Sequence, residues 1–205
     1  MATFNGYTIV PVPSVPGARS IEFTATDAVG AVVSPFTGQQ QIQSWQAAWL
    51  GATVSMPPMK DSLARAWVAF LLSCNGVQNI FQLGDPMRKS PLGSGAGAPK
   101  VNGANQTGFT LSTKGWTASA AGVLLPGDCL QIGYRLYTNV YPVNADGSGD
   151  AIITIWPNLR ESPADATSIV LANTTGIWRL ADNARHWSIS AMRTYGVQFK
   201  IREAI

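Results

Sequence analysis

Charged residues are scarce in this chain of 205 residues, where Asp, Glu, Lys and Arg together make up 12%. Soluble domains usually contain roughly 25%. Disordered chains are rich in charge and poor in aromatic residues, whereas this chain has seven Trp. It also has 20 Gly and 13 Pro, too many for a long helical or coiled-coil protein. The composition therefore predicts a globular, β-rich protein with few charges on its surface.

Long apolar runs and secretory signals are also missing. The longest apolar run, Ala66–Leu72, is far shorter than the roughly 18 residues that span a membrane. The N-terminus has no basic start followed by an apolar stretch, so we see no secretory signal. The two cysteines, Cys74 and Cys129, are too few and too far apart for a disulfide framework. We therefore expect synthesis and residence in a reducing cytoplasm, without membrane insertion.

The few charges are unevenly distributed. Residues 1–59 contain only Arg19, Glu22 and Asp27, whereas five basic and two acidic residues lie from Arg179 onward. The net charge of +3 is too small for nucleic-acid recognition, which needs dense basic patches. The C-terminal excess is either a solvated strand face or a contact for an acidic partner. The uncharged N-terminal region either exposes little surface or is covered by another protein.

The first third of the chain favours extended structure. Three Pro in residues 1–20 predict an extended arm or edge segment. Residues 21–26 alternate apolar and polar side chains, as a half-buried strand does, and residues 27–30 can form a turn before a second strand at Val32-Val33.

Residues 39–56 fit either a strand or a helix, because Trp45 and Trp49 share a face in both. Gly51 and the β-branched pair Thr53-Val54 favour a strand. A bulge near Leu50-Gly51 would place the two Trp and Val54 in one core.

The clearest pattern lies between residues 59 and 74. Apolar residues recur there at helical spacing: Met59, Leu63, Trp67, Phe70, Leu71 and Cys74. Asp61 suits the first turn of a helix, and Asn75-Gly76 can end it in a left-handed conformation. We predict one amphipathic helix at about residues 60–75 whose apolar stripe belongs to the core.

The rest of the chain suggests an insertion. A strand at residues 80–83 is followed by a Gly- and Pro-rich linker at residues 90–99. Residues 100–172 have turn signals at short intervals, which is typical of a small sandwich or barrel. The alternation of Val197, Phe199 and Ile201 predicts a final strand that rejoins the N-terminal sheet. Residues 95–172 would then be an inserted module within a domain of residues 1–94 and 173–205.

No set of residues indicates catalysis, a cofactor or a metal. His186 is the only His, and neither cysteine has the basic neighbours that lower the pKa of a reactive thiol. Zinc-ligand spacing is absent. Asp146, Ser148 and Asp150 resemble half of a calcium loop without its final acidic ligand. Asp128 and Glu161 are the candidates for a carboxylate pair in a sugar hydrolase, although each suits a strand end. We therefore expect no enzyme activity.

Several tryptophans could instead form a sugar-binding platform. Trp67 is predicted to lie in the core, as are Trp45 and Trp49. Four others are open to a core, interface or sugar-stacking role: Trp116, Trp156, Trp178 and Trp187. A carbohydrate-binding β module is therefore the alternative function, and glycan binding followed by Trp fluorescence would test it.

Residues 45–86 together resemble a known family. Trp45 and Trp49 precede Pro57-Pro58, the helix with Trp67 and Phe70-Leu71, and then Gly76, Phe81 and Gly84-Asp85-Pro86. Further along, the similarity continues through Pro126-Gly127-Asp128, the strand at 152–157 with Arg160 after it, and a final strand near Glu203. This order resembles the small tail-tip proteins, or distal tail proteins, of tailed bacteriophages.

The resemblance implies a mainly β protein: a β-sandwich or split-barrel hub domain that carries the helix, plus a small all-β module. It implies a structural virion protein, made in the host cytoplasm, that forms a trimeric or hexameric ring. The ring would join the tail tube protein to tail hub, baseplate or receptor-binding proteins. The arm of residues 1–20 and the uncharged stretch to residue 59 would be subunit contacts, because an extended arm can add a strand to a neighbour's sheet. The family implies no catalytic residues.

Overall fold

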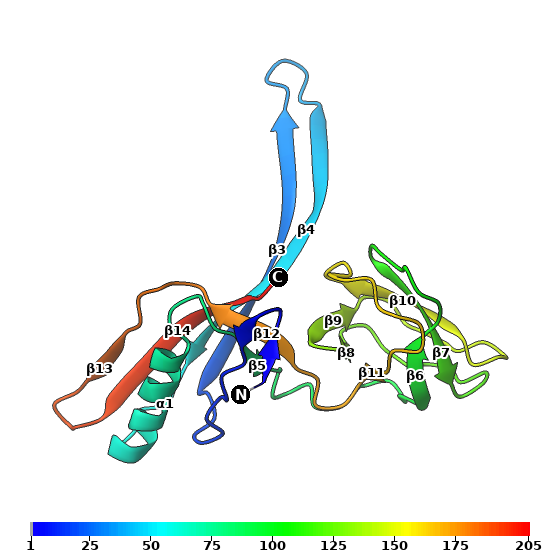
Figure 1. The fold of residues 1–205 in the computed structure, drawn as a ribbon. Helices are drawn as coiled ribbons and strands as arrows, with labels where there is room; N and C mark the ends of the chain where they lie inside the picture. The colour runs from blue at the N-terminus through cyan, green and yellow to red at the C-terminus, as the bar shows by residue number, and fades with distance from the viewer. Residues whose placement is uncertain (1) are drawn as a thin grey trace.

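The computed structural model describes residues 2–205, apart from the side chain of Gln46, and it is mainly β, with 43% strand and 6% helix. The predicted fold class is confirmed. Five strands form one antiparallel sheet, the main sheet, in the order β3-β4-β14-β12-β5 (Figure 1). A sixth strand, β13, pairs with the N-terminal end of β14. These strands are β3 (Ser20–Val33), β4 (Gln40–Ser55), β5 (Phe81–Leu83), β12 (Gly176–Leu180), β13 (Trp187–Ile189) and β14 (Tyr195–Glu203).

The second sheet, the barrel sheet, has the order β11-β8-β9-β10-β7-β6 and is nearly closed. Its two end strands meet through a bridge between Lys100 and Ser168. The Val101 N–H also donates to the Thr167 carbonyl, at 2.9 Å. Its strands are β6 (Gly97–Val101), β7 (Thr110–Trp116), β8 (Cys129–Ile132), β9 (Arg135–Asn139), β10 (Ala151–Trp156) and β11 (Ile169–Val170). The all-β structure expected for this part of the chain is therefore present.

The helix α1 (Asp61–Ser73) packs on the main sheet, as the apolar periodicity predicts. Trp67, Phe70, Leu71 and Cys74 are buried there, although Leu63 of the predicted stripe is exposed and Ala64 is buried in its place. The Phe70 ring meets the Phe81 ring of β5 edge to face at 5.1 Å. The helix ends where Asn75 and Gly76 both take positive φ angles, which is the stop that the sequence predicts.

Two large clusters of buried side chains are separate. One joins α1 to the main sheet and the other fills the barrel sheet. A small third cluster of Ile80, Ile177 and Ala204, with Phe4 and Tyr134 against it, lies where the two sheets meet. The exact division at residues 94/95 and 172/173 stays a prediction. The final strand does rejoin the N-terminal sheet, because β14 pairs with β4 from Gln198 to Arg202.

The N-terminal arm has no helix over residues 2–20. It forms a two-stranded ribbon of β1 (Thr3–Phe4) and β2 (Tyr7–Thr8), and then runs beside Ile80 through a parallel bridge from Ile9. In a single chain the arm therefore packs on its own protein, and its expected role as a subunit contact stays a prediction. Residue 1 lies outside the described residues. Further along, the alternation of Leu130, Ile132, Tyr134 and Leu136 suggests one strand, but the segment forms two. Gly133, with a φ of 58°, turns the chain between β8 and β9.

The turn expected at residues 27–30 is wrong. β3 continues through this segment to Val33, paired with β4, and the chain turns at residues 34–39. There the Ser34 N–H donates to the Gln39 carbonyl at 2.9 Å, and Gly38 has a φ of 69°. Pairing with β4 overrides the local turn signal of the Asp–Gly segment, so that one long hairpin replaces two short strands.

The bulge expected near Leu50-Gly51 is also misplaced. The register of the hairpin shifts between Asp27↔Ala48 and Val29↔Ser44, where β4 has three residues opposite one of β3. The buried residues of β4 are then Ala48, Ala52 and Val54, all of one parity. Trp45 and Trp49 have the other parity and do not lie in the core as expected. Trp45 is 57% exposed, and Trp49 lies under the Arg202 guanidinium.

Candidate interaction surface

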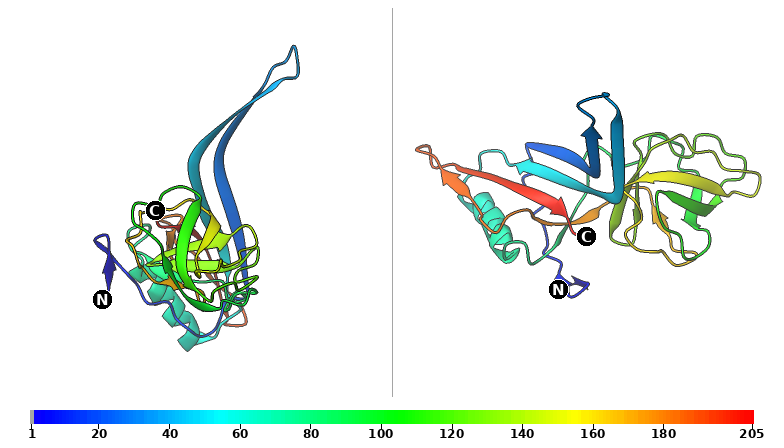
Figure 2. Two further views of the ribbon diagram at one scale, coloured as in Figure 1. Left: turned by 90° about the vertical axis from the view of Figure 1, so that its right-hand side faces the viewer. Right: turned by 90° about the horizontal axis from the view of Figure 1, so that it is seen from above.

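Beyond the bulge, the β3–β4 hairpin leaves the body of the protein. Figure 1 and the left view of Figure 2 show it projecting as an isolated two-stranded ribbon. We call residues 28–45 the projecting hairpin. This segment contains no charged residue, since the nearest are Asp27 and Lys60. An isolated two-stranded hairpin is marginally stable in water, so such a ribbon gains stability from being covered.

The two faces of the projecting hairpin differ. Cross-strand pairing places Val29, Ala31, Val33 and Ile42 on one side, together with the polar residues Gln40 and Ser44. We call this side the aliphatic face. Val29, Val33 and Ile42 are all more than half exposed. The tip carries Phe36, which is 95% exposed. An exposed aliphatic surface of this kind marks a binding site or a risk of aggregation.

The opposite face carries Val32, Gln41 and Gln43, together with Trp45. A Cβ atom on Gly30 would lie 3.1 Å from the Trp45 ring. Glycine at position 30 therefore lets the indole approach the β3 backbone closely. β3 is also the end strand of the main sheet, so its outer backbone groups are available to a further strand.

A buried ion pair joins the two sheets at the base of this hairpin. Arg160, which follows β10, binds Glu203 at the end of β14 through two contacts of 2.9 and 2.7 Å. The side chains are 6% and 9% exposed. Arg160 also donates to the Ala48 carbonyl, and the Leu50 N–H donates to Glu203 at 3.2 Å. A bidentate pair with these additional bonds is a strong interaction.

The pairing of Arg160 with Glu203 was not predicted from the sequence, where both residues entered only through the family resemblance. The signal was present: Glu203 has the same parity as Val197, Phe199 and Ile201. A carboxylate on the apolar face of a strand is rarely buried without a partner. Arg135 of β9 binds Glu161 at 2.7 Å within the barrel part of the chain. Arg135 also donates to the Ala204 carbonyl after β14, which is a second link between the two sheets.

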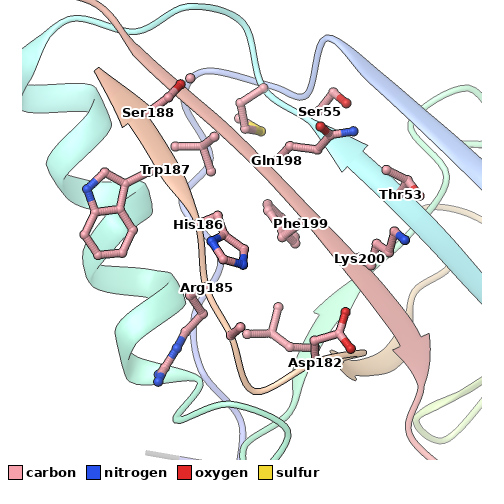
Figure 3. Close-up of a pocket in the computed structure, with 15 residues that line it drawn as sticks. Thr53, Ser55, Asp182, Arg185, His186, Trp187, Ser188, Gln198, Phe199 and Lys200 are labelled. Carbon is pink, nitrogen blue, oxygen red and sulfur yellow. The ribbon is translucent and has the colours of Figure 1, made fainter. Parts of the chain in front are cut away.

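A groove with a volume of about 680 Å³ lies beside β14. It opens where the chain between β12 and β13 loops away from the sheet (Figure 1). His186, Asp182, Lys200 and Trp187 line it (Figure 3). Arg185 also lines it but points away from Lys200 in this view. Ser55 and Ser188 also line the groove, but among the described residues no hydrogen bond joins either hydroxyl to His186, so the geometry does not define a reaction.

Both cysteines are buried, but the expectation that neither has a basic neighbour is wrong. The Arg88 guanidinium donates to Cys129 Sγ at 3.5 Å, and Arg185 lies near Cys74. Cys74 is fully buried at the end of α1, and Cys129 is buried in β8. Burial raises the pKa of the Cys74 thiol to about 12, and the nearby Arg185 only partly opposes this. Because the thiolate is the nucleophile, Cys74 is a poor candidate for catalysis with His186.

We expect Cys74 to resist thiol reagents while the protein is folded. A rise in pKa from 9.0 to about 12 lowers the thiolate population about a thousandfold at neutral pH. Reaction of a Cys129→Ser variant with an aromatic disulfide reagent should therefore be slow until denaturant is added. The raised pKa also contributes stability that is present below about pH 9 and is lost as the pH rises toward 12. Rapid labelling of the folded variant would contradict this.

The acidic candidates hold loops in place. Asp128 is buried and accepts the N–H groups of Leu92, Gly93 and Leu125 at 2.7–3.0 Å. It therefore fastens the predicted linker to the barrel sheet. Glu161 binds Arg135. Among the described residues Asp128 and Glu161 share no contact or partner, so the structure gives no support for a carboxylate pair.

The half calcium loop is an ordinary turn. Asp146 accepts the N–H groups of Ser148 and Asp150, both at 2.8 Å, and these bonds lower its pKa. Asp150 accepts from Asn102 at 3.2 Å. Over residues 2–205, no three His, Cys, Asp or Glu side chains are placed to hold a metal ion.

The tryptophans do not gather into a platform. Trp116 and Trp178 are buried, as is Trp67. The Trp156 indole N–H donates to Asp27 at 2.8 Å. Of the four that the sequence left open, Trp187 is the exposed one, at 41%. A sugar-stacking surface would therefore have to rely on isolated rings.

Scans of family models and of curated proteins find no match to this chain. Among the described residues, no helix is long and apolar enough to cross a membrane.

Proposed function

We propose that this protein is a structural component of a phage tail tip. It forms a homo-oligomeric ring, trimeric or hexameric, that joins the tail tube to hub, baseplate or receptor-binding proteins. The observation that supports this proposal best is the projecting hairpin, an uncharged ribbon with an exposed aliphatic face. Surfaces of this kind are costly for a monomer and are useful in an assembly that covers them.

A covered hairpin would also remove the exposed edges of the main sheet, because a neighbouring chain can supply the missing strand contacts. The buried Arg160–Glu203 pair and the bond from Arg135 to the Ala204 carbonyl support the same function, since both join the barrel sheet to the main sheet. The cysteines and acidic candidates described above have structural partners, which suits a protein without a reaction to perform.

The purified protein is expected to have a mass of three or six times 21.7 kDa when measured by light scattering. Electron microscopy of the same fraction should show rings. The measurement is repeated with a tail tube protein added, because some rings form only on their partner. A strictly monomeric protein at high concentration, with no ring on the tube protein, would count against the proposal.

A further inference from the structure

The base of the projecting hairpin is held by the barrel sheet at one rung of the β3–β4 ladder. Asp27 of β3 and Ala48 of β4 are paired residues, and theirs is the last pair before the register shift. Trp156 of β10 donates to the Asp27 carboxylate at 2.8 Å, and Arg160 donates to the Ala48 carbonyl. The barrel sheet therefore contacts both strands at the same rung.

These contacts continue the edge of β4 after its partner strand has ended. β14 pairs with β4 only as far as Arg202 opposite Gly51. Beyond that point the Glu203 carboxylate accepts the Leu50 N–H and Arg160 donates to the Ala48 carbonyl. The ion pair thus supplies an acceptor and a donor where a neighbouring strand would have supplied backbone groups.

The position of the rung matters because a bulge bends and twists the strand that contains it. A hairpin that begins at a bulge, and is free on both edges, could point in a range of directions. Fixing the last regular rung from both strands restricts that range. Trp156 is a large, stiff side chain on a regular strand, and Arg160 is buried and satisfied by Glu203. Both are suited to hold the rung rigidly.

We propose that the barrel sheet clamps the projecting hairpin at the Asp27–Ala48 rung and sets the direction in which it projects. Trp156 and Arg160 are positioning residues in this clamp. The hairpin and the inserted module then move as one rigid body. In the proposed ring the hairpin contacts a neighbouring chain, and the clamp would then fix the angle between subunits. This last step rests on the proposed function.

The test is a distance between spin labels at the hairpin tip and in the turn that follows β7 of the barrel sheet. Thr37→Cys and Ala118→Cys provide exposed sites, whereas the native cysteines are buried. Labelled protein is diluted with unlabelled protein so that only distances within one chain are detected. We expect a single narrow distance, which broadens in Trp156→Phe because the ring is kept and the N–H donor is lost.

Substitutions at Asp27 separate the clamp from a general loss of packing. Asp27→Asn keeps an oxygen that can accept the indole N–H, so the distance should stay narrow. Asp27→Ala removes it, so the distance should broaden as in Trp156→Phe. Trp187→Phe on β13 is the matched control and should leave the distance unchanged. Hydrogen exchange at the paired amides near the rung should also become about threefold to tenfold faster in Trp156→Phe, the effect of one lost hydrogen bond.

A distance that stays narrow in both Trp156→Phe and Asp27→Ala overturns the clamp. The mass of each sample is measured in parallel. A narrow distance that broadens in these variants supports the clamp whether the protein is a monomer or a ring. The proposed function is tested separately by the mass, because a monomeric mass would contradict the ring and leave the clamp unaffected.

Discussion

Val33→Lys combined with Ile42→Glu is expected to reduce the assembled protein to a monomer. Both residues lie on the aliphatic face, diagonally across the two strands. Two charges there would have to be desolvated in any contact that buries this face, which costs several kcal/mol per unpaired ion. Each is more than half exposed, so the fold of the monomer should be retained. The opposite signs keep an attraction between the strands.

Light scattering and circular dichroism together check this prediction. The mass should fall to 21.7 kDa, while the β spectrum and thermal midpoint stay close to those of the unmodified protein. Met87→Lys combined with Met192→Glu is the matched control, because both residues are about 90% exposed but lie outside the hairpin. Rings that persist in the hairpin variant would show that the aliphatic face is not the subunit contact.

The second large effect is expected at the junction of the two sheets. Arg160→Met leaves Glu203 buried without its partner, and breaking a buried pair in this way costs about 3–5 kcal/mol. For a protein of this size, such a loss lowers Tm by roughly 10 °C. The variant also removes the bond to the Ala48 carbonyl, which adds to the effect.

Denaturant unfolding of Arg160→Met and of Arg65→Met compares a buried ion pair with an exposed one. Arg65 binds Asp61 at 2.7 Å on the surface of α1, and its loss should cost at most about 0.5 kcal/mol. The double variant Arg160→Met with Glu203→Leu should recover part of the stability, since no charge remains buried. Equal losses for the two single variants would mean that Arg160 is not effectively buried in solution.

The helix and the final strand could be predicted because their signals are local. Each follows from side chains a few positions apart, as in the stripe from Trp67 to Cys74 and the alternation from Val197 to Ile201. The cap at Asn75-Gly76 depends only on which residues tolerate a positive φ. The long hairpin could not be predicted in this way, because Asp27–Gly30 resembles a turn until β4 is known to pair with it.

The tryptophans show the same limit. Their number indicates a large apolar content, but it does not say which face of β4 carries them. A one-residue bulge near Gly51 would have placed Trp45 and Trp49 on the same face as Val54. Instead the pairing of β4 with β3 is regular from Ala48 to Ser55, and the three residues at 45–47 opposite one of β3 leave the parity unchanged, so both Trp lie on the face opposite to Val54. The register with the partner strand therefore decides whether a side chain is core or interaction surface.

By itself the sequence determined the mainly β fold class, the helix, the all-β middle region and the uncharged character of the N-terminal region. These follow from composition and from neighbours in the chain. Only the tertiary structure decided that the uncharged region projects as one hairpin, and that Arg160 meets Glu203, 43 positions away. The physical reason is that burial of a charge, and the continuation of a strand, depend on partners that are distant in sequence and are brought together only by folding.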